Sequence, residues 1–256
     1  MSAVIMGILN LTPDSFWESS RYNMSILESG ADIIDIGAVS SRPGASYVGP
    51  EEEWARLEPF LKTLKTDREI SIDTTRAEIV RRACDLIGPF IVNDISAGED
   101  DPEMLTEVGR LGLKYIAMHR HSIRNAEGVP DIDILTDFFG AFGEKAGMAG
   151  IREWIIDPGF GFNKDVEENL LILRNLERLK PFGRKILAGV ADKRFTHSEE
   201  LQSQEYTGLG LDGTEAAHLE ALRRGAGILR VHDVKKARRT VGLYEELFVE
   251  QARGLV

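Results

Sequence analysis

The chain has 256 residues, of which 43% are hydrophobic and 29% charged, and its formal net charge is −11. The acidic balance excludes a general binder of nucleic acids or of anionic membranes, and no apolar run reaches the roughly 18 residues of a membrane span. A single cysteine excludes an internal disulfide, so we expect a protein of the reducing cytoplasm.

Eight short apolar runs alternate along the chain with segments of helical periodicity. We predict strands over residues 4–9, 32–36, 69–73, 90–94, 114–118, 153–157, 185–190 and 227–231. Most of these runs are apolar on both faces, which is typical of parallel strands covered by helices. With no linker or change of composition, the pattern predicts an α/β protein with one domain over residues 1–256, a single (β/α)8 TIM barrel.

The segments between the runs carry the signals of helix ends. Pro50 is followed by three glutamates, and both features suit the first turn of a helix. Asp101, followed by a proline, predicts another helix start, and Gly112 predicts the end of that helix. Asp212 and Glu215 have the spacing of a capping box.

A polar residue stands at the end of each predicted strand. The carboxyl ends of all eight strands of a (β/α)8 barrel meet at the face that holds the active site. Four such residues are Asp73, Asn93, Asp157 and Lys193. Carboxylate and amide groups offer acceptors and donors in one plane, which suits a flat heterocycle, and Phe160 and Phe162 add ring faces beside glycines.

A second set of strand-end residues is suited to anions. Arg230 and His232 are two residues apart, so they share one face of an extended segment. Together with Asn10 and the hydroxyls of Ser40 and Ser41, they predict a site for phosphate or pyrophosphate. If Mg²⁺ accompanies the anion, the side-chain oxygen of Asn10 with water and phosphate oxygens would suit that cation.

Two other patterns are poor matches to known sites. Residues 159–164 do not form a dinucleotide fingerprint, because Lys164 stands where the last glycine would be. His119 and His121 alone are a weak zinc pattern, and we expect them to be structural or to contact substrate.

Taken together, the strand-end motifs resemble those of the dihydropteroate synthase family. They are NLTPDSF at 10–16, SRPGA at 41–45, SIDT at 71–74, VNDI at 92–95, MH at 118–119, DPGFGF at 157–162, KRF at 193–195 and RVHD at 230–233. Each motif is short, but eight of them in unbroken order make the resemblance specific.

The resemblance implies a transferase of folate biosynthesis, usually a homodimer. It would condense 6-hydroxymethyl-7,8-dihydropterin pyrophosphate with 4-aminobenzoate, giving 7,8-dihydropteroate and pyrophosphate. The implied pterin-binding residues are Asp73, Asn93, Asp157 and Lys193. The implied pyrophosphate-binding residues are Asn10, Ser41, Arg230 and His232, with Mg²⁺ at Asn10. The implied aminobenzoate-binding residues are Ser40, Ser41, Arg42, Pro43 and Phe162.

The residues also suit the chemistry of that reaction. Loss of pyrophosphate leaves a methylene cation conjugated to the pterin, and a carboxylate such as Asp73 would stabilise it. Arg230 and His232 would stabilise the leaving group, and the amine of aminobenzoate would then attack. The expected catalytic residues are therefore Asp73, Lys193, Arg230 and His232.

The chain departs from the family pattern at three places. Ala191 and Asp192 precede Lys193 where the family has serine and arginine, and Ser41 replaces a threonine. Asn163 replaces a glycine, and asparagine can still adopt a left-handed backbone conformation. The first two departures predict an altered aminobenzoate site.

Two alternative functions stay open at this point. One is a methyltetrahydrofolate:corrinoid methyltransferase, which shares the barrel and the pterin-binding Asp and Asn but has no use for a lysine and an Arg-x-His anion site. The other is a pterin-binding protein that no longer condenses its ligand, and Ala191-Asp192 is the feature that favours it.

Overall fold

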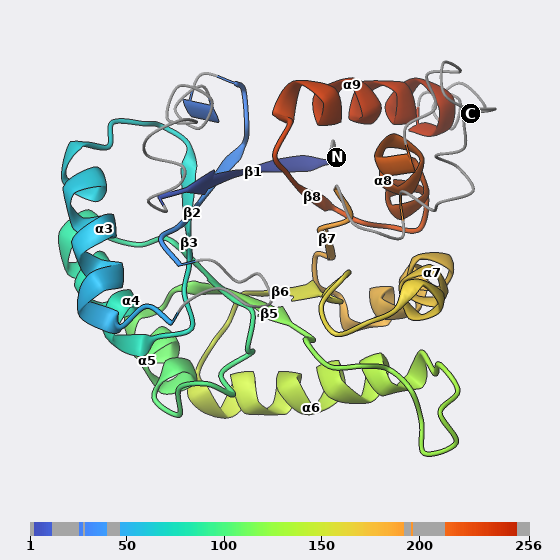
Figure 1. Ribbon diagram of the computed structural model, residues 1–256, viewed down its shortest axis with the longest axis horizontal. Helices are drawn as coiled ribbons and strands as arrows, with labels where there is room; N and C mark the ends of the chain where they lie inside the picture. Colours follow the sequence, from blue (N-terminus) through green and yellow to red (C-terminus); the bar gives the residue numbers. More distant parts are fainter. Residues whose placement is uncertain are drawn as a thin grey trace. The chain divides into compact units, whose positions relative to one another are not determined.

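A computed structural model describes residues 3–11, 26–27, 29–39, 47–191, 196 and 213–249. From the second strand onward, each strand is followed by a helix (Figure 1). The strands are β1 Val4–Asn10, β2 Ile33–Gly37, β3 Glu69–Asp73, β4 Ile91–Asp94, β5 Lys114–Met118, β6 Trp154–Asp157, β7 Leu187–Ala188 and β8 Ile228–Val231. The α-helices are α3 Pro50–Thr63, α4 Ala77–Ile87, α5 Met104–Leu111, α6 Asp133–Ala149, α7 Val166–Arg174, α8 Gly213–Arg223 and α9 Val234–Tyr244, with a 3₁₀ helix η1 Leu176–Phe182 and a π-helix η3 Glu245–Val249.

The eight strands form one sheet in the order β6-β5-β4-β3-β2-β1-β8-β7. Neighbouring strands pair in parallel, as for β1 with β2, β2 with β3 and β7 with β8. The two strands at the ends of this order are linked by a parallel bridge between Ile156 in β6 and Ile186 just before β7. Sequential parallel strands with helical connections define a (β/α)8 fold and confirm the predicted class.

Two elements differ from the predicted bounds by more than one residue. The seventh strand is Leu187–Ala188 rather than 185–190, because only these residues pair in register with β8. The helix predicted to start at Asp101 begins at Met104. The Asp101 carboxylate instead accepts hydrogen bonds from Ala77 N at 2.8 Å and Glu103 N at 2.9 Å, which makes a turn before α5. Gly112 ends α5 in a left-handed conformation, as predicted.

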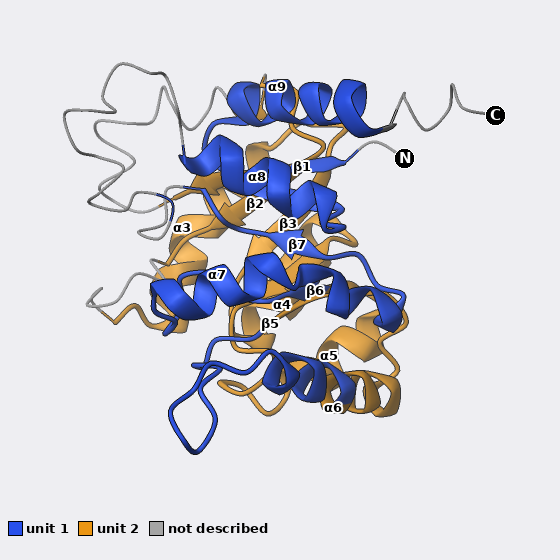
Figure 2. Ribbon diagram, turned by 90° about the vertical axis from the view of Figure 1, so that its right-hand side faces the viewer, with its two compact units in different colours: residues 1–5, 119–140, 156–256 blue, residues 6–118, 141–155 orange. Residues whose placement is uncertain are grey.

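The chain divides into two compact units, coloured separately in Figure 2. Unit 1 comprises Met1–Ile5, His119–Gly140 and Ile156–Val256, and unit 2 comprises Met6–Met118 and Ala141–Ile155. In unit 2, α3 packs against α4 and α4 against α5, and in unit 1, α7 and α9 both pack against α8. The expected single domain over residues 1–256 stays a prediction.

Local sequence accounts for α3 and its packing in unit 2. Pro50 occupies the first turn with acidic residues behind it, as predicted, and Leu57 and Leu61, one helical turn apart, are buried. Glu53 is also buried, and its carboxylate accepts a 2.7 Å hydrogen bond from Thr74 Oγ1 and pairs with the guanidinium of Arg76. This pairing satisfies the buried charge and connects α3 to the segment after β3.

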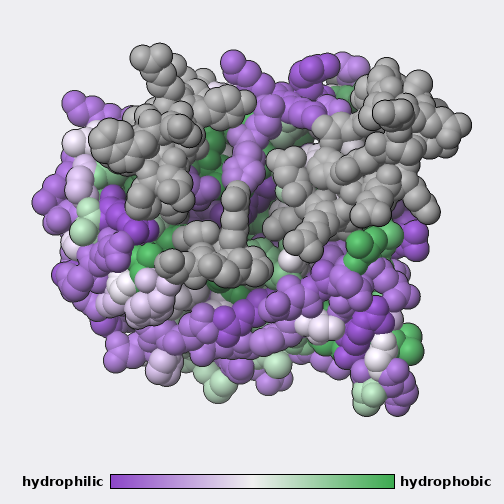
Figure 3. Space-filling view, viewed as in Figure 1, coloured by the Kyte–Doolittle hydropathy of each residue, from purple (hydrophilic) through white to green (hydrophobic). Residues whose placement is uncertain are grey.

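Hydrophilic residues predominate among the coloured residues on the face shown in Figure 3. Within the described residues, none of the helices combines the length and the apolar character that a membrane span requires.

Candidate active site

Four strand-end residues of unit 2 stand side by side in one row of the sheet. The strand register pairs Asn10 with Gly37, Gly37 with Asp73, and Asp73 with Asn93. Residues in register on parallel strands project to the same side of the sheet. The predicted residues Asn10, Asp73 and Asn93 therefore share one side at the carboxyl ends of β1, β3 and β4.

Gly37 lies between Asn10 and Asp73 and lets them approach each other. A Cβ atom at Gly37 would lie 3.4 Å from Asp73 Cβ and 3.7 Å from Asn10 Oδ1. Both side chains thus lie next to the space that a larger residue at position 37 would fill. The Asp73 carboxyl group and the Asn10 amide oxygen therefore both border the space above Gly37.

The packing of β4 and β5 identifies which side of the sheet this is. Asp94, next to Asn93, accepts a 2.5 Å hydrogen bond from Tyr115 Oη, and the Tyr115 ring stacks on Phe142 of α6. Asp94 therefore faces the helices, and Asn93 faces the opposite side. Burial raises the pKa of the Asp94 carboxyl, which also binds Ser96 N in the turn after β4.

Asn93 has a partner that sequence reasoning left without a role. Its Nδ2 donates a 3.0 Å hydrogen bond to Oδ2 of Asp35, and both side chains are buried. Because a carboxylate only accepts, this bond fixes the orientation of the amide and turns its oxygen away from Asp35. A charged residue inside the apolar run of β2 was the available signal, since buried carboxylates require partners.

In unit 1, Asp157 ends β6 and begins a tightly turned loop. Its Oδ1 accepts a 2.8 Å hydrogen bond from Gly159 N, and it is buried. Gly159 has a φ of +71°, and a Cβ there would lie 2.0 Å from the carbonyl oxygen of His119. Only glycine fits this approach of two backbone segments. Of the two aromatic residues that follow, Phe160 is buried and Phe162 is half-buried.

Asn163 adopts the left-handed conformation expected for its position, with a φ of 46°. Its Nδ2 also donates a 3.1 Å hydrogen bond to the carbonyl oxygen of Arg120. The replacement of glycine by asparagine is therefore compatible with the loop. It adds a contact to the segment after β5 that glycine could not make.

Arg230 and His232 lie at the end of β8 in unit 1. Arg230 is half-buried and His232 is exposed. Asp233 caps α9, because its carboxylate accepts a 2.9 Å hydrogen bond from Lys236 N. The cap holds the helix start directly after the two predicted anion-binding residues.

The remaining predicted site residues lie outside the described residues. They are Ser40, Ser41, Arg42, Pro43 and Lys193. Asp212 of the predicted capping box is also outside them. In the described part of the chain, no three His, Cys, Asp or Glu side chains gather in a way that could hold a metal ion.

His119 and Lys164 are two buried, titratable residues close to Asp157 in unit 1. Burial lowers the pKa of His119 to about 3, and its ring packs edge-on against Phe138 of α6. Burial also lowers the pKa of Lys164 to about 7. Sequence reasoning did not assign Lys164 a role, and the D-x-x-E spacing that follows it signals only the start of α7.

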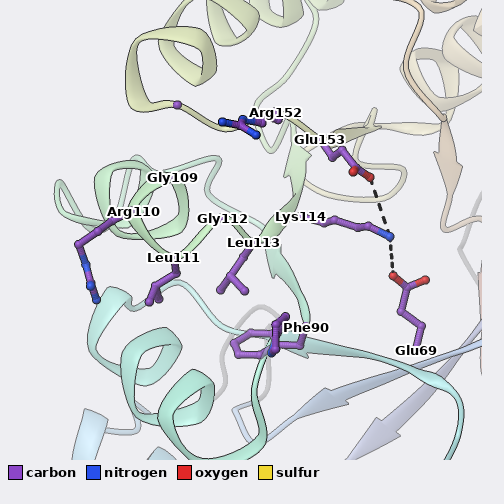
Figure 4. A pocket seen from close by; sticks show the side chains of 12 residues that line it. Glu69, Phe90, Gly109, Arg110, Leu111, Gly112, Leu113, Lys114, Arg152 and Glu153 are labelled. Carbon is purple, nitrogen blue, oxygen red and sulfur yellow. Dashed lines mark hydrogen bonds and ion pairs between the residues drawn. The ribbon is translucent and has the colours of Figure 1, made fainter.

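A cavity of about 690 Å³ lies at the other ends of the unit 2 strands (Figure 4). Phe90 and Leu113 line one side of it, and Lys114, at the start of β5, lies between Glu69 and Glu153. Glu69 and Lys114 begin β3 and β5, and Phe90 and Glu153 directly precede β4 and β6, so the cavity lies at the amino ends of these strands. In (β/α)8 enzymes the active site lies at the carboxyl ends, so this cavity is not the candidate site.

Comparison with known proteins places these features in a family. The sequence profile of the family described as pterin binding enzyme matches residues 6–232. The chain is 37% identical over 249 residues to a dihydropteroate synthase of Synechocystis, covering 90% of this chain and 85% of that protein. It is 36% identical over 264 residues to a dihydropteroate synthase of Neisseria meningitidis, covering 95% and 92%.

Solved structures agree with the sequence relatives. The Xanthomonas albilineans dihydropteroate synthase with 4-aminobenzoic acid superposes with a TM-score of 0.82 at 34% identity, covering 97% of this chain and 94% of that one. The Clostridium difficile dihydropteroate synthase with pteroic acid has a TM-score of 0.84 at 34% identity, covering 96% and 97%. A further structure of the Xanthomonas protein, at 33% identity and a TM-score of 0.80 over 97% and 94%, contains 7,8-dihydropteroate.

Proposed function

This chain belongs to the dihydropteroate synthase family of pterin-binding enzymes, and from that premise we infer that it joins a pterin to 4-aminobenzoate. The substrates are 6-hydroxymethyl-7,8-dihydropterin pyrophosphate and 4-aminobenzoate, and the products are 7,8-dihydropteroate and pyrophosphate. The protein is a transferase.

The observation that carries this function is the row of Asn10, Gly37, Asp73 and Asn93 across four strand ends. A carboxylate and an amide on one side of the sheet match a flat ring with alternating nitrogen and carbonyl groups. The bond from Asn93 to Asp35 presents the amide in a single orientation. A ligand therefore meets a fixed set of donors and acceptors, which favours recognition of one heterocycle.

We assign the pterin to Asp73, Asn93, Asp157 and Lys193. Asp157 adds a second carboxylate, which is buried and accepts a hydrogen bond from Gly159 N. As pyrophosphate leaves, positive charge develops on the methylene group of the pterin, and the Asp73 carboxylate stabilises it. The aminobenzoate amine then attacks the methylene carbon, the carbon–oxygen bond to pyrophosphate having broken, and the amine loses its proton. The chain acts by positioning and charge, without a protein nucleophile.

We assign the pyrophosphate to Asn10, Ser41, Arg230 and His232, because a guanidinium fork and neutral donors suit phosphate oxygens. Mg²⁺ fits this arrangement, since Asn10 offers a hard oxygen ligand close to Asp73 and this cation is commonly held by few protein ligands. When bound, it would neutralise charge on the leaving pyrophosphate.

We assign 4-aminobenzoate to Ser40, Ser41, Arg42, Pro43 and Phe162. The replacement of the family's serine by Ala191 predicts a weaker contact with the carboxylate of this substrate. The homodimer and the cytoplasmic location also stay predictions.

Pyrophosphate release, measured with and without 4-aminobenzoate, tests the function. We expect release from the pterin pyrophosphate to require 4-aminobenzoate and dihydropteroate to form in equal amount. Pterin binding without turnover would instead support a non-condensing protein. Methyl transfer from methyltetrahydrofolate to a corrinoid would support a methyltransferase.

A further inference from the structure

A buried lysine in unit 1 connects two loops beside Asp157. Lys164 is 8% exposed, and its Nζ donates hydrogen bonds to His119 O at 2.7 Å, Gly159 O at 3.1 Å and Phe162 O at 3.3 Å. The first carbonyl follows β5, and the other two belong to the loop after β6. An ammonium group has three N–H donors, so these three carbonyls match its full capacity.

We propose that Lys164 is a positioning residue for pterin binding, whose ammonium group joins the loops after β5 and β6 and thereby orients the Asp157 carboxylate. The proposal rests on the assignment of Asp157 to the pterin. Lys164 itself contacts neither substrate.

The path from Lys164 to Asp157 is short. The carbonyl of Gly159 accepts from Lys164, and the N–H of the same glycine donates to Asp157 Oδ1 at 2.8 Å. Gly159 also lies against the carbonyl of His119, where not even a Cβ atom fits. A displacement of Gly159 therefore moves the donor that orients the carboxylate. A shift of about 1 Å in a positioning group can cost about 10²-fold in rate.

The same loops have a second connection that does not involve Lys164. The buried carboxylate of Glu168 accepts hydrogen bonds from Ile123 N at 2.7 Å, Asp165 N at 2.7 Å and the hydroxyl of Ser122. Gly161 N is bound separately, by Asn169 Oδ1 at 2.8 Å. We therefore expect the fold to persist without the Lys164 ammonium, while the Gly159 segment becomes looser.

Because Lys164 can lose its charge, its hydrogen bonds to the loops after β5 and β6 depend on pH. Burial lowers its pKa to about 7, against the opposing influence of Asp157 at the end of β6 and Glu168 on α7. His119 faces it from the segment after β5 and is neutral near pH 7, since its own pKa is about 3. Above pH 7 the neutral amine has two N–H donors for three carbonyls, so pterin binding weakens as the pH rises through this value.

The test compares Lys164→Met, which keeps an unbranched side chain but no donor, with Lys114→Met at the amino end of β5. Thermal unfolding first checks that both variants are folded. Pteroic acid affinity is then measured by calorimetry between pH 6 and pH 9, alongside turnover. Amide hydrogen exchange reports on Gly159, Gly161 and Phe162, with Ala237 in α9 as the internal reference.

We expect Lys164→Met to lose about 10²-fold in kcat/KM for the pterin pyrophosphate and in pteroic acid affinity. The change in pteroic acid affinity near pH 7 should disappear in this variant, and the amide hydrogens of Gly159 and Phe162 should exchange faster. Lys114→Met should behave as wild type. Unchanged affinity and loop exchange in a folded Lys164→Met would overturn the proposal.

If Lys164→Met does not fold, a titration of Lys164 in the wild-type protein tests the proposal instead. The Lys164 side chain, followed by NMR, should titrate near pH 7 together with pteroic acid affinity. Affinity that stays constant while Lys164 titrates would overturn the proposal. Wild-type protein that lacks turnover would contradict the proposed function instead, and affinity and loop exchange would still decide the role of Lys164.

Discussion

The carboxylate of Asp35 acts on the candidate site through Asn93. It accepts from Nδ2 of Asn93 at 3.0 Å, and the two residues are 58 positions apart in the chain. The amide nitrogen must face the carboxylate, so the amide oxygen faces elsewhere. Asp35 therefore determines which groups Asn93 offers to a ligand without having to touch that ligand.

This pairing predicts the behaviour of a charge swap. Asn93→Asp places two carboxylates in buried contact, and we expect it to lower the free energy of unfolding at pH 7 by about 3 kcal/mol. The double variant Asp35→Asn with Asn93→Asp restores an N–H donor opposite a carboxylate and should recover most of that loss. It should not recover turnover, because position 93 then presents a charged carboxylate in place of a neutral amide. Urea unfolding and the pyrophosphate assay measure the two effects, and equal losses in single and double variants would contradict the pairing.

His119 predicts a pH dependence of stability. Burial lowers its folded-state pKa to about 3, below the ordinary value of 6.5, so the unfolded chain binds more protons between these values. Its contribution to stability is therefore present above pH 6.5 and lost as the pH falls toward 3. Between pH 7 and pH 5 we expect a loss of about 2 kcal/mol that is missing in His119→Gln. Urea unfolding at both pH values measures it, and an identical pH dependence in the two proteins would refute the assignment.

At the scale of elements, the start of α7 is both a helix cap and a connection between loops. Asp165 and Glu168 form a capping box, in which each side chain accepts from the backbone N–H of the other. Glu168 also binds Ile123 N in the segment after β5, and Arg124 in that segment pairs with Asp165. The element that follows β6 is thereby joined to the loop that follows β5.

The dual role of this cap predicts an unequal response to alanine substitution. Asp233→Ala removes a simple cap from α9 and should cost about 1 kcal/mol. Glu168→Ala leaves buried donors on two segments without an acceptor and should cost about 3 kcal/mol. Thermal or urea unfolding compares them. Similar losses in the two variants would show that the cross-loop bonds contribute little.

At the scale of the whole molecule, the two ends of the strands carry different kinds of polar residue. The carboxyl ends of β1 to β4 present Asn10, Asp73 and Asn93 in one row. At the amino ends, Lys114 pairs with Glu69 at 2.8 Å, and the hydrogen bond that Lys114 donates to the Glu69 carboxylate raises the pKa of Lys114. The charges at the amino ends are thus paired with one another, whereas the row at the carboxyl ends is the proposed ligand site.

This division predicts that Lys114→Met leaves turnover unchanged. Its ion pairs are partly exposed, with 44% of the Lys114 side chain accessible, and such pairs contribute at most about 1 kcal/mol. The small loss of stability should shrink further in high salt. A large fall in kcat with an intact fold would mean that the amino ends of the strands take part in function.

The sequence alone determined the class of fold and the chemistry at the strand ends. Apolar runs bounded by polar residues predict parallel strands, and the order of motifs predicts the family, because both are local patterns. The left-handed conformation of Asn163 and the cap at Asp233 also follow from residue type, since side-chain size and nearby hydrogen bonds decide them.

Only the tertiary structure decided which of the polar residues are partners of one another. Asp35 meets Asn93, and Lys164 meets the carbonyl of His119, across sequence separations that no local pattern encodes. The burial of Lys164, and with it the low pKa of its ammonium group, results from segments that pack around it from different parts of the chain. Desolvation and hydrogen-bond geometry depend on those neighbours in space, so they arise only when the chain has folded.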